Sequence, residues 1–568
     1  MRRFAAVLIT FLLVAVAAVA ARTSVGTAAS DRTDAVRGGT LRITNGDDVD
    51  FLDTADAYSP VAWALQRLYS RTLYAYQSSK NTRIAATPAP DLAAGPPRIS
   101  PDGRTYTFTL RQGVRWAPPV SRQVVAQDFV YGLHRMFDRK TPSSGQPYAL
   151  LIQGAEAFGA GKAKSISGIK AVNPRTLRIT LVRPGGDFLS ILSMGFFAPI
   201  PKEVASKYAV GSAYSKHVVA IGPYRLESYQ PGKKITFSRN PNWNAKTDPL
   251  RKAWVDRVEV NMGATADAAT LAIQRGDADL SLNLDPPVAS LGQITRDPKL
   301  RSRFTTKYNG CVEYMPLNTN VGAGAIAKVK VRQAINYAID KQSLRRTRGG
   351  TLAGEIASSI LPPTQFGFTR YNLYPSADDR GNVEKAKQLL RDAGYPNGLT
   401  LNYVGSSTGY GPAFTTALQA SLARAGIKLK IKTFQGFSVY YESLLFPAKR
   451  LEHQIADAEW CPDYPGDGAR SFFLPLFHSK SIMKAANNNM AEYAVPAVDR
   501  AIDKALATRS APSRAKQWAA LDKRIMRDAP WAPWLYANQP FLWSERLQNW
   551  TYSPWHHNAD LSNVWLGS

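Results

Sequence analysis

The predicted fold class is α/β, with two or three domains. Segments in which apolar residues recur at helical spacing alternate with short segments of strand-like alternation. The chain is 568 residues long, and one hydrophobic core rarely serves so long a chain. Hydrophobic residues make up 45% of the sequence and aromatic residues 10%, which is typical of globular rather than disordered proteins.

The N-terminal segment is typical of a secretory signal. Arg2 and Arg3 precede an uncharged, mostly apolar stretch at 4–20, and Ala-Val-Ala at 18–20 fits a signal cleavage site. We therefore expect residues 1–29 to be a signal peptide and the protein to be exported, to the periplasm or cell envelope. A retained membrane anchor is the alternative, since the stretch reaches the lower length limit for a span. No cysteine lies near it, so we expect no N-terminal lipidation.

Residues 38–138 are predicted to form a strand, a helix, a hairpin and a second helix. GGTLRIT at 38–44 alternates like a strand, and residues 60–76 have helical spacing. Pro101-Asp102-Gly103 predicts a turn, because proline fixes φ and glycine permits positive φ. Threonines alternate with apolar residues over 105–110, which predicts one strand of a hairpin. Residues 126–138 predict a helix with these apolar residues on one side: Phe129, Leu133, Met136 and Phe137.

The rest of the chain repeats a helix and strand order. A strand-rich zone spans about 166–262, and residues 269–284 predict a helix, a glycine stop and a strand. Residues 328–346 predict another amphipathic helix. Two units, 382–404 and 414–434, each predict a helix, a glycine and a strand.

The charge and cysteine content narrow the functional classes. The formal net charge is +28, but the basic residues are spread along the whole chain, so we expect no nucleic-acid partner. A solvated basic surface is the plainer interpretation; an anionic membrane face or wall polymer is the alternative. The two cysteines, Cys311 and Cys461, most simply form one disulfide in an exported chain. A nucleophilic cysteine is the alternative, although no histidine lies within seven residues of either.

Motifs for catalysis are missing from the sequence. It has no P-loop, no G-x-S-x-G and no H-E-x-x-H, and its six histidines are scattered apart from His556-His557. We therefore expect a protein that is not an enzyme and that holds no metal or cofactor. A glycosidase pair of carboxylates stays open, because such pairs come from distant strands.

Several segments, in the same order, resemble the oligopeptide-binding proteins of ABC importers, within extracytoplasmic solute-binding family 5. They are SPDGRTYTFTLRQGVRW, AQDFVYGLHRMFD, IGPYRLESYQPGKKITFSRNPNWN, VRQAINYAIDKQSL, AKQLLRDAGYPNGLTL and APWLYANQPF. The likeness runs from about Gly38 to the C-terminal end. It implies a periplasmic-binding-protein-like class II fold, in which two lobes close about a hinge, with an extra inserted domain.

The resemblance also implies the domain boundaries and the function. Lobe I would comprise 38–70, 208–308 and 537–568, the inserted domain II 71–207, and lobe III 309–536. The protein would be a monomer that captures oligopeptides in a closing cleft and then docks on an ABC permease in the membrane. No bond would be made or broken.

The segment AEWCPDYPGDGARSFF, from Ala458, carries the implied site. In the family, the aspartate of a W-C-x-D-Y segment binds the α-amino group of the peptide, and this position is Asp463. By the same match Trp460 walls the cleft, Cys461 bonds to Cys311, and Tyr148 and Tyr536 contact the peptide. The alternatives are a turn role for Asp463 and ordinary packing for the aromatic residues.

Two positions depart from the family pattern. Asp457 stands where the family has an arginine that receives a ligand carboxylate, and Tyr58 aligns roughly with a family glutamate. We therefore expect a preference for cationic or C-terminally blocked peptides. A different solute is an alternative function: a nickel chelate or other metal chelate, haem, an oligosaccharide or an antibiotic. A wall-associated enzyme or a chaperone-like scaffold that reuses the fold is another.

Overall fold

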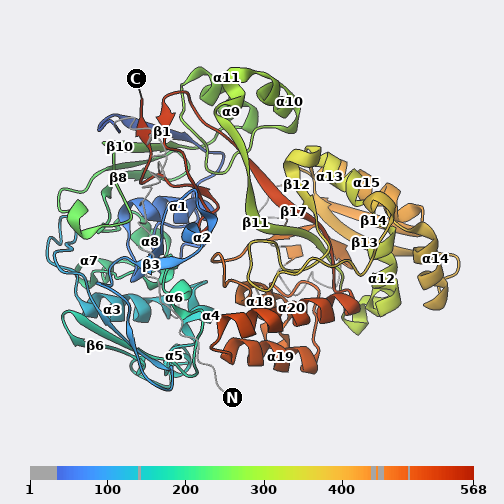
Figure 1. The fold of residues 1–568 in the computed structure, drawn as a ribbon, viewed down its shortest axis with the longest axis horizontal. Coiled ribbons are helices and arrows are strands. Elements are labelled where there is room, and N and C mark those ends of the chain that lie inside the picture. Colours follow the sequence, from blue (N-terminus) through green and yellow to red (C-terminus); the bar gives the residue numbers. More distant parts are fainter. Residues whose placement is uncertain are drawn as a thin grey trace, which may run out of the picture.

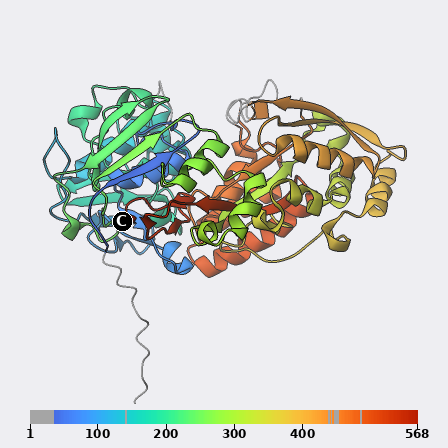
Figure 2. The same cartoon turned by 90° about the horizontal axis from the view of Figure 1, so that it is seen from above.

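The computed structural model of the chain describes residues 35–138, 143–435, 440, 443–444, 453–483 and 487–567. The predicted signal peptide at 1–29 lies outside them. Within these ranges, the helices are all too short or too polar to span a membrane. The described chain forms two parts that lie side by side, one built from the first half of the chain with the C-terminal tail, the other from the rest (Figures 1 and 2).

The first part contains a mixed sheet in the strand order β1-β10-β9-β8. β1 and β10 are parallel and the other neighbours are antiparallel, so the predicted N-terminal strand pairs with a strand more than 200 residues later. α1 packs against β8. The bounds are Thr40–Thr44 (β1), Pro60–Tyr69 (α1), Tyr224–Gln230 (β8), Lys234–Arg239 (β9), Arg257–Asn261 (β10), Ala266–Arg275 (α9), Val288–Arg296 (α10) and Pro298–Arg301 (α11).

A second, antiparallel sheet in this part has the order β4-β5-β7-β6. The predicted turn is present: Gly103 has φ 71° and its N–H donates to Ser100 at 2.8 Å. The predicted apolar alternation is confirmed, because Tyr106 and Phe108 are buried while the flanking threonines are not. The bounds are Tyr74–Tyr76 (β2), Thr82–Ala85 (α2), Pro88–Pro90 (β3), Arg98–Ile99 (β4), Thr105–Thr109 (β5), Ala126–Met136 (α3), Gln146–Ala149 (α4), Ala155–Gly159 (α5), Ile169–Asn173 (β6), Thr176–Thr180 (β7), Phe188–Ile191 (α6), Lys202–Ala205 (α7) and Ser212–Ser215 (α8).

The helix predicted over 60–76 is shorter than expected. Ser59 caps α1 and Pro60 follows it, but the helix ends at Tyr69 because Ser70 is extended. The buried guanidinium of Arg71 pairs with Asp91, and the chain then enters β2, which pairs with β3. A tertiary ion pair and a sheet partner therefore override the local helical spacing. The strand predicted after α9 is likewise reduced to a single bridge between Ile43 and Leu280.

The second part contains a sheet in the order β12-β17-β11-β16 and a parallel sheet in the order β14-β13-β15. The two predicted units of helix, glycine and strand are α14 with β13 and α15 with β14, and Gly426 before β14 has φ 86°. The bounds are Phe304–Pro316 (β11), Val329–Ala338 (α12), Lys341–Thr347 (α13), Gly354–Ile356 (β12), Val383–Asp392 (α14), Leu399–Ser406 (β13), Gly411–Ala423 (α15), Ile427–Phe434 (β14), Ile455–Ala456 (β15), Ala458–Trp460 (β16), Arg470–Phe477 (α18), Pro496–Ala507 (α19), Ala511–Asp528 (α20) and Trp531–Leu542 (β17).

The long antiparallel strands β11 and β17 pass from one part to the other (Figure 1). Their register is irregular between Tyr308 and Val312, where Gly310 has φ 82°. An irregularity of this kind allows a pair of strands to bend locally while the hydrogen bonds between them persist on either side. The two strands can therefore serve as a hinge between two lobes. After β17 the tail closes with four short strands: Leu547–Gln548 (β18), Tyr552–Ser553 (β19), Asn558–Ala559 (β20) and Trp565–Leu566 (β21). Domain boundaries at 70, 207, 308 and 536 stay predictions.

Candidate functional site

The site is built around β16, the edge strand of its sheet. β16 pairs with β11 so that Val312 lies opposite Trp460 and Glu313 opposite Glu459. The same register places Cys311 opposite Cys461, and these cysteines form a disulfide. The predicted bridge is therefore present, and it ties the end of β16 to the hinge strand two residues before Asp463.

Three predicted residues from distant segments meet at Asp463. The hydroxyl of Tyr58, just before α1, donates to Oδ1 of Asp463 at 2.6 Å. The hydroxyl of Tyr148, in α4, donates to Oδ2. The backbone N–H of Asp463 reaches Oγ of Ser471 at 3.3 Å, and the residue is 5% exposed. Asp463 therefore lies where the two parts of the molecule touch.

Electrostatics leave this carboxylate short of a counterion. Burial raises the pKa of Asp463 to about 6, although hydrogen bonds from Tyr148 and Tyr58 pull it down. Burial and the nearby carboxylate raise the pKa of both phenols well above 10, so they stay protonated and act as donors. No lysine or arginine of the described ranges forms an ion pair with Asp463. A cation from outside the chain would complete the site.

Trp460 and Tyr536 lie on the face of the sheet away from Cys311 and Cys461, because neighbouring residues of a strand point to opposite faces. Both stand opposite Val312 and pack in the same apolar cluster. The indole N–H of Trp460 donates to the Ser471 carbonyl at 2.8 Å, and the hydroxyl of Tyr536 lies 2.5 Å from that of Ser359. The structure thus brings these two residues together with the core rather than with the Asp463 carboxylate. Their contact with a ligand stays a prediction.

Asp457 lies in a second group of charges beside β16. It is buried, and its Oδ2 accepts a hydrogen bond from Tyr410 at 3.2 Å. The same hydroxyl lies 3.3 Å from Glu313, which pairs with Arg348. Sequence reasoning missed Glu313, Arg348 and Tyr410. No local pattern signals these three residues, because they come from β11, the end of α13 and the start of α15, which lie far apart in the sequence.

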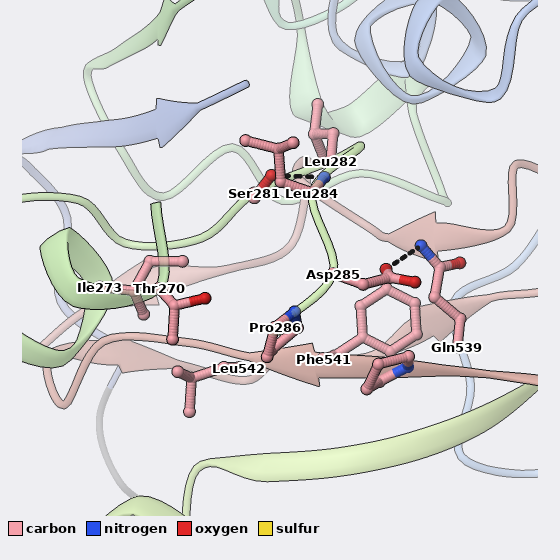
Figure 3. A pocket seen from close by; sticks show the side chains of 11 residues that line it. Thr270, Ile273, Ser281, Leu282, Leu284, Asp285, Pro286, Gln539, Phe541 and Leu542 are labelled. Atoms are coloured by element: carbon pink, nitrogen blue, oxygen red, sulfur yellow. Dashed lines mark hydrogen bonds between the residues drawn. The ribbon is translucent and has the colours of Figure 1, made fainter. Parts of the chain in front are cut away.

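A small pocket lies beside β17 where this strand enters the first part of the molecule (Figure 3). Asp285 and Gln539 face each other in it, and the amide of Gln539 donates to Asp285 at 3.1 Å. Burial raises the pKa of Asp285 to about 6. The pocket is also lined by apolar side chains that include Ile273, Phe541 and Leu542. Sequence reasoning gave no role to these residues.

Asp187 of the first part forms a buried contact with the second part. Arg470, the first residue of α18, pairs with Asp187 at 2.5 and 3.1 Å, and the hydroxyl of Tyr464 donates to it at 2.8 Å. Burial raises the pKa of Asp187, but Arg470 and Tyr464 outweigh it and hold the pKa below its ordinary value. All three side chains are nearly inaccessible, so they form a buried contact between the two parts.

We expect Arg470→Ala to disfavour closure, because Asp187 would stay buried with the Tyr464 hydroxyl but without its ion-pair partner, at a cost of about 3–5 kcal/mol. Small-angle scattering of the protein with saturating solute should then show a larger radius of gyration, and solute affinity should fall at least about tenfold. Arg239→Ala is the matched control, since its pair with Asp256 is exposed. An unchanged radius and affinity for Arg470→Ala would contradict a closing role.

Comparisons with known proteins agree with this architecture. The family model of the bacterial extracellular solute-binding proteins, family 5 (middle), matches residues 87–483. Heme-binding protein A of Haemophilus influenzae is 29% identical over 479 residues, 81% of each chain. The dipeptide-binding protein of Escherichia coli is 28% identical over 406 residues, 68% of this chain and 70% of that one.

A solved structure adds to the sequence likeness. The clavulanic acid biosynthesis oligopeptide binding protein 2 superposes with a TM-score of 0.86 and 28% identity, over 94% of this chain and 96% of that one. The resemblance inferred from the sequence is thus confirmed, and with it the α/β, two-lobed binding-protein fold. The chain belongs to the bacterial extracellular solute-binding proteins of family 5.

Proposed function

We propose that this protein is the solute-binding subunit of an ABC importer and that it captures oligopeptides by their α-amino group. One observation carries the proposal: the buried Asp463 carboxylate has two phenol donors and no cation of the described ranges beside it. A peptide ammonium would supply the missing charge. The names of relatives that bind dipeptides and oligopeptides support the same ligand class.

The edge of β16 supports an extended ligand. One side of this strand pairs with β11, and no other strand of the described chain pairs with its second side. A peptide in extended conformation could add to this edge through main-chain hydrogen bonds, which are independent of side-chain identity. This arrangement favours a binder that tolerates varied peptide sequences.

The position of the phenols couples binding to closure. Tyr58 and Tyr148 belong to the first part of the molecule, while Asp463 belongs to the second. A ligand ammonium held by Asp463 therefore lies at the junction, where its charge is shielded from water once the lobes close. The closed complex would then dock on the membrane permease, and the peptide would be released intact.

Titration calorimetry with tetra-alanine tests this proposal. We expect binding of the peptide with a free amino terminus and a loss of at least about a hundredfold on N-acetylation, because acetylation removes the charge. The C-terminally amidated peptide should keep its affinity. Mass spectrometry after prolonged incubation should recover the peptide uncleaved.

Failure of every peptide to bind would overturn the proposal, as would equal affinity for the acetylated peptide. Haem serves as the competing ligand, because one relative bears its name. Haem binding without peptide binding would assign the protein to that solute instead.

A further inference from the structure

One face of the parallel sheet β14-β13-β15 carries a row of lysines. Lys428, Lys430 and Lys432 alternate along β14, so their side chains share one face, and all three are exposed. In the neighbouring strand β13, Thr400 and Asn402 lie opposite Lys428 and Lys430 and are exposed as well. We name these residues the lysine face. It belongs to the second part of the molecule, on the side remote from the first part (Figure 1).

The other face of this sheet is covered by helices. Leu401, Tyr403, Ile427 and Leu429 pack in one apolar cluster with residues of α12, α14 and α15. Parallel sheets occur almost only with both faces covered, and their strands then read as continuous apolar runs. β14 instead alternates between buried and exposed positions over 427–430. The sequence therefore keeps one face of a parallel sheet polar and accessible, which is unusual for this architecture.

The charge of the lysine face is not neutralised within the described ranges. Lys428 and Lys430 form no ion pair and no side-chain hydrogen bond there. The acidic residues of the nearby helix α14, Glu384 and Asp392, pair instead with lysines of α14 and α12. Lysines two residues apart on a strand lie about 7 Å from each other and repel one another. An anionic partner would therefore be attracted to this face.

The chemistry of the face fits a charged surface better than a folded partner or a small anion. Protein interfaces are rich in aromatic residues and arginine, whereas lysine is depleted there. A small anion needs donors that converge on it, but side chains on one face of a strand stand side by side. Lysine is a compact, strongly hydrated point charge, and a charged bilayer attracts such residues without a specific geometry.

Apolar residues beside the row favour a bilayer over a soluble polyanion. Ile431, between Lys430 and Lys432, is 38% exposed. Phe434, at the end of β14, is half-buried, and the ammonium of Lys432 lies 5.3 Å from the centre of its ring. Binding at a membrane surface gains from buried apolar area as well as from attraction to anionic lipids. A linear polyanion would offer nothing apolar to Ile431.

We propose that the lysine face binds the surface of a bilayer that contains anionic phospholipids. This goes beyond solute capture, because it would hold the protein at the membrane in which its permease lies. β14 is also an edge strand, and lysines on such strands discourage pairing with another chain. That role by itself predicts no affinity for a bilayer, so a binding experiment separates the two.

Sedimentation with large vesicles tests the inference on the protein purified after export. At about 0.1 M salt we expect binding to vesicles of phosphatidylcholine and phosphatidylglycerol in equal parts, and none to phosphatidylcholine alone. Raising the salt to about 1 M shortens the Debye length from about 10 Å to about 3 Å and should abolish binding. Lys428→Gln combined with Lys430→Gln should weaken binding about twentyfold, since each lysine near an anionic surface contributes about fivefold.

Lys162→Gln combined with Lys170→Gln is the matched control, because it removes the same charge from two exposed lysines of the first part. It should weaken binding about threefold at most, through the loss of net charge alone. Thr400→Glu gives a second variant of the face: it places a carboxylate opposite Lys428 and should weaken binding about fivefold. Thermal melts and calorimetry with tetra-alanine should show that each variant folds and captures peptide like wild type.

Absence of binding to the anionic vesicles would overturn the inference while leaving peptide capture intact. Equal losses in the two double variants would overturn it too, because net charge rather than this face would then account for the binding. Binding to soluble polyphosphate without binding to vesicles would assign the face to an anionic polymer and overturn the choice of a membrane.

Discussion

Asp463→Asn should weaken the binding of peptides with a free amino terminus by between about a hundredfold and several thousandfold. The physical reason is that the ligand ammonium would enter a buried site without an opposite charge, at a cost of about 3–5 kcal/mol. Asparagine keeps the shape of the side chain and can still accept hydrogen bonds from Tyr58 and Tyr148, so the loss reports on charge. Titration calorimetry at pH 7.5 measures it, and an affinity within threefold of wild type would contradict the assignment.

The same substitution should stabilise the protein without ligand at neutral pH. Folding raises the pKa of Asp463 from 3.8 to about 6 through burial. The folded state then binds protons more tightly than the unfolded state, so this contribution to stability is complete below pH 3.8 and is lost as the pH rises through 6. The free energy of unfolding that wild type loses over this pH range is about 2–3 kcal/mol. Asparagine does not titrate, so the variant keeps its stability.

Urea unfolding of wild type and variant at pH 4.5 and pH 7.5 measures this effect. The stability of Asp463→Asn relative to wild type should increase between the two values. Asp256→Asn, at an exposed carboxylate, should leave the difference near zero. A variant less stable than wild type at pH 7.5 would mean that the carboxylate serves the fold rather than a ligand.

Removal of the disulfide should lower both the stability of the protein and its affinity for peptides. Replacing Cys311 and Cys461 by serine opens a loop of 150 residues, and the loss of a native disulfide typically costs about 2–5 kcal/mol. Peptide affinity should fall too, because the bridge holds the end of β16 beside the hinge strand, two residues from Asp463. Urea unfolding with and without a reducing agent measures the stability.

Reduced wild type and the double serine variant should unfold at the same urea concentration, and the reductant should leave the variant unchanged. Oxidised wild type should unfold at a clearly higher concentration. If both proteins unfold at the same urea concentration with and without the reductant, the bridge does not stabilise this fold. If stability falls but peptide affinity does not, the bridge does not position Asp463.

Local patterns predicted individual elements well. The turn at Gly103, the alternation of Tyr106 and Phe108, and the glycine at 426 each follow from short-range sterics and side-chain periodicity. The helix through residue 76 was wrong beyond Tyr69, because the buried Arg71 takes Asp91 as its partner. A helical pattern carries no information about such a partner, which lies 20 residues away.

The residues of the candidate site were likewise predicted only in part. Asp463, Tyr58, Tyr148 and the cysteines were predicted one by one, from a motif and from cysteine content. Asp187, Arg470 and Arg348 were missed, because charged residues of this kind are usual on solvated surfaces. Their role depends on burial against partners 283 residues away in one case and 35 in the other.

The sequence by itself determined the α/β class, the family resemblance, the bridge between its two cysteines and a list of separate candidate residues. Only the tertiary structure decided that Tyr58 and Tyr148 converge on one carboxylate, that Trp460 and Tyr536 pack against the core, and that Arg348 pairs with the buried Glu313. The physical reason is the distance along the chain over which each kind of interaction acts. Backbone sterics and side-chain periodicity act over a few residues, whereas burial, charge balance and hydrogen-bond pairing depend on which distant segments the closed lobes bring together.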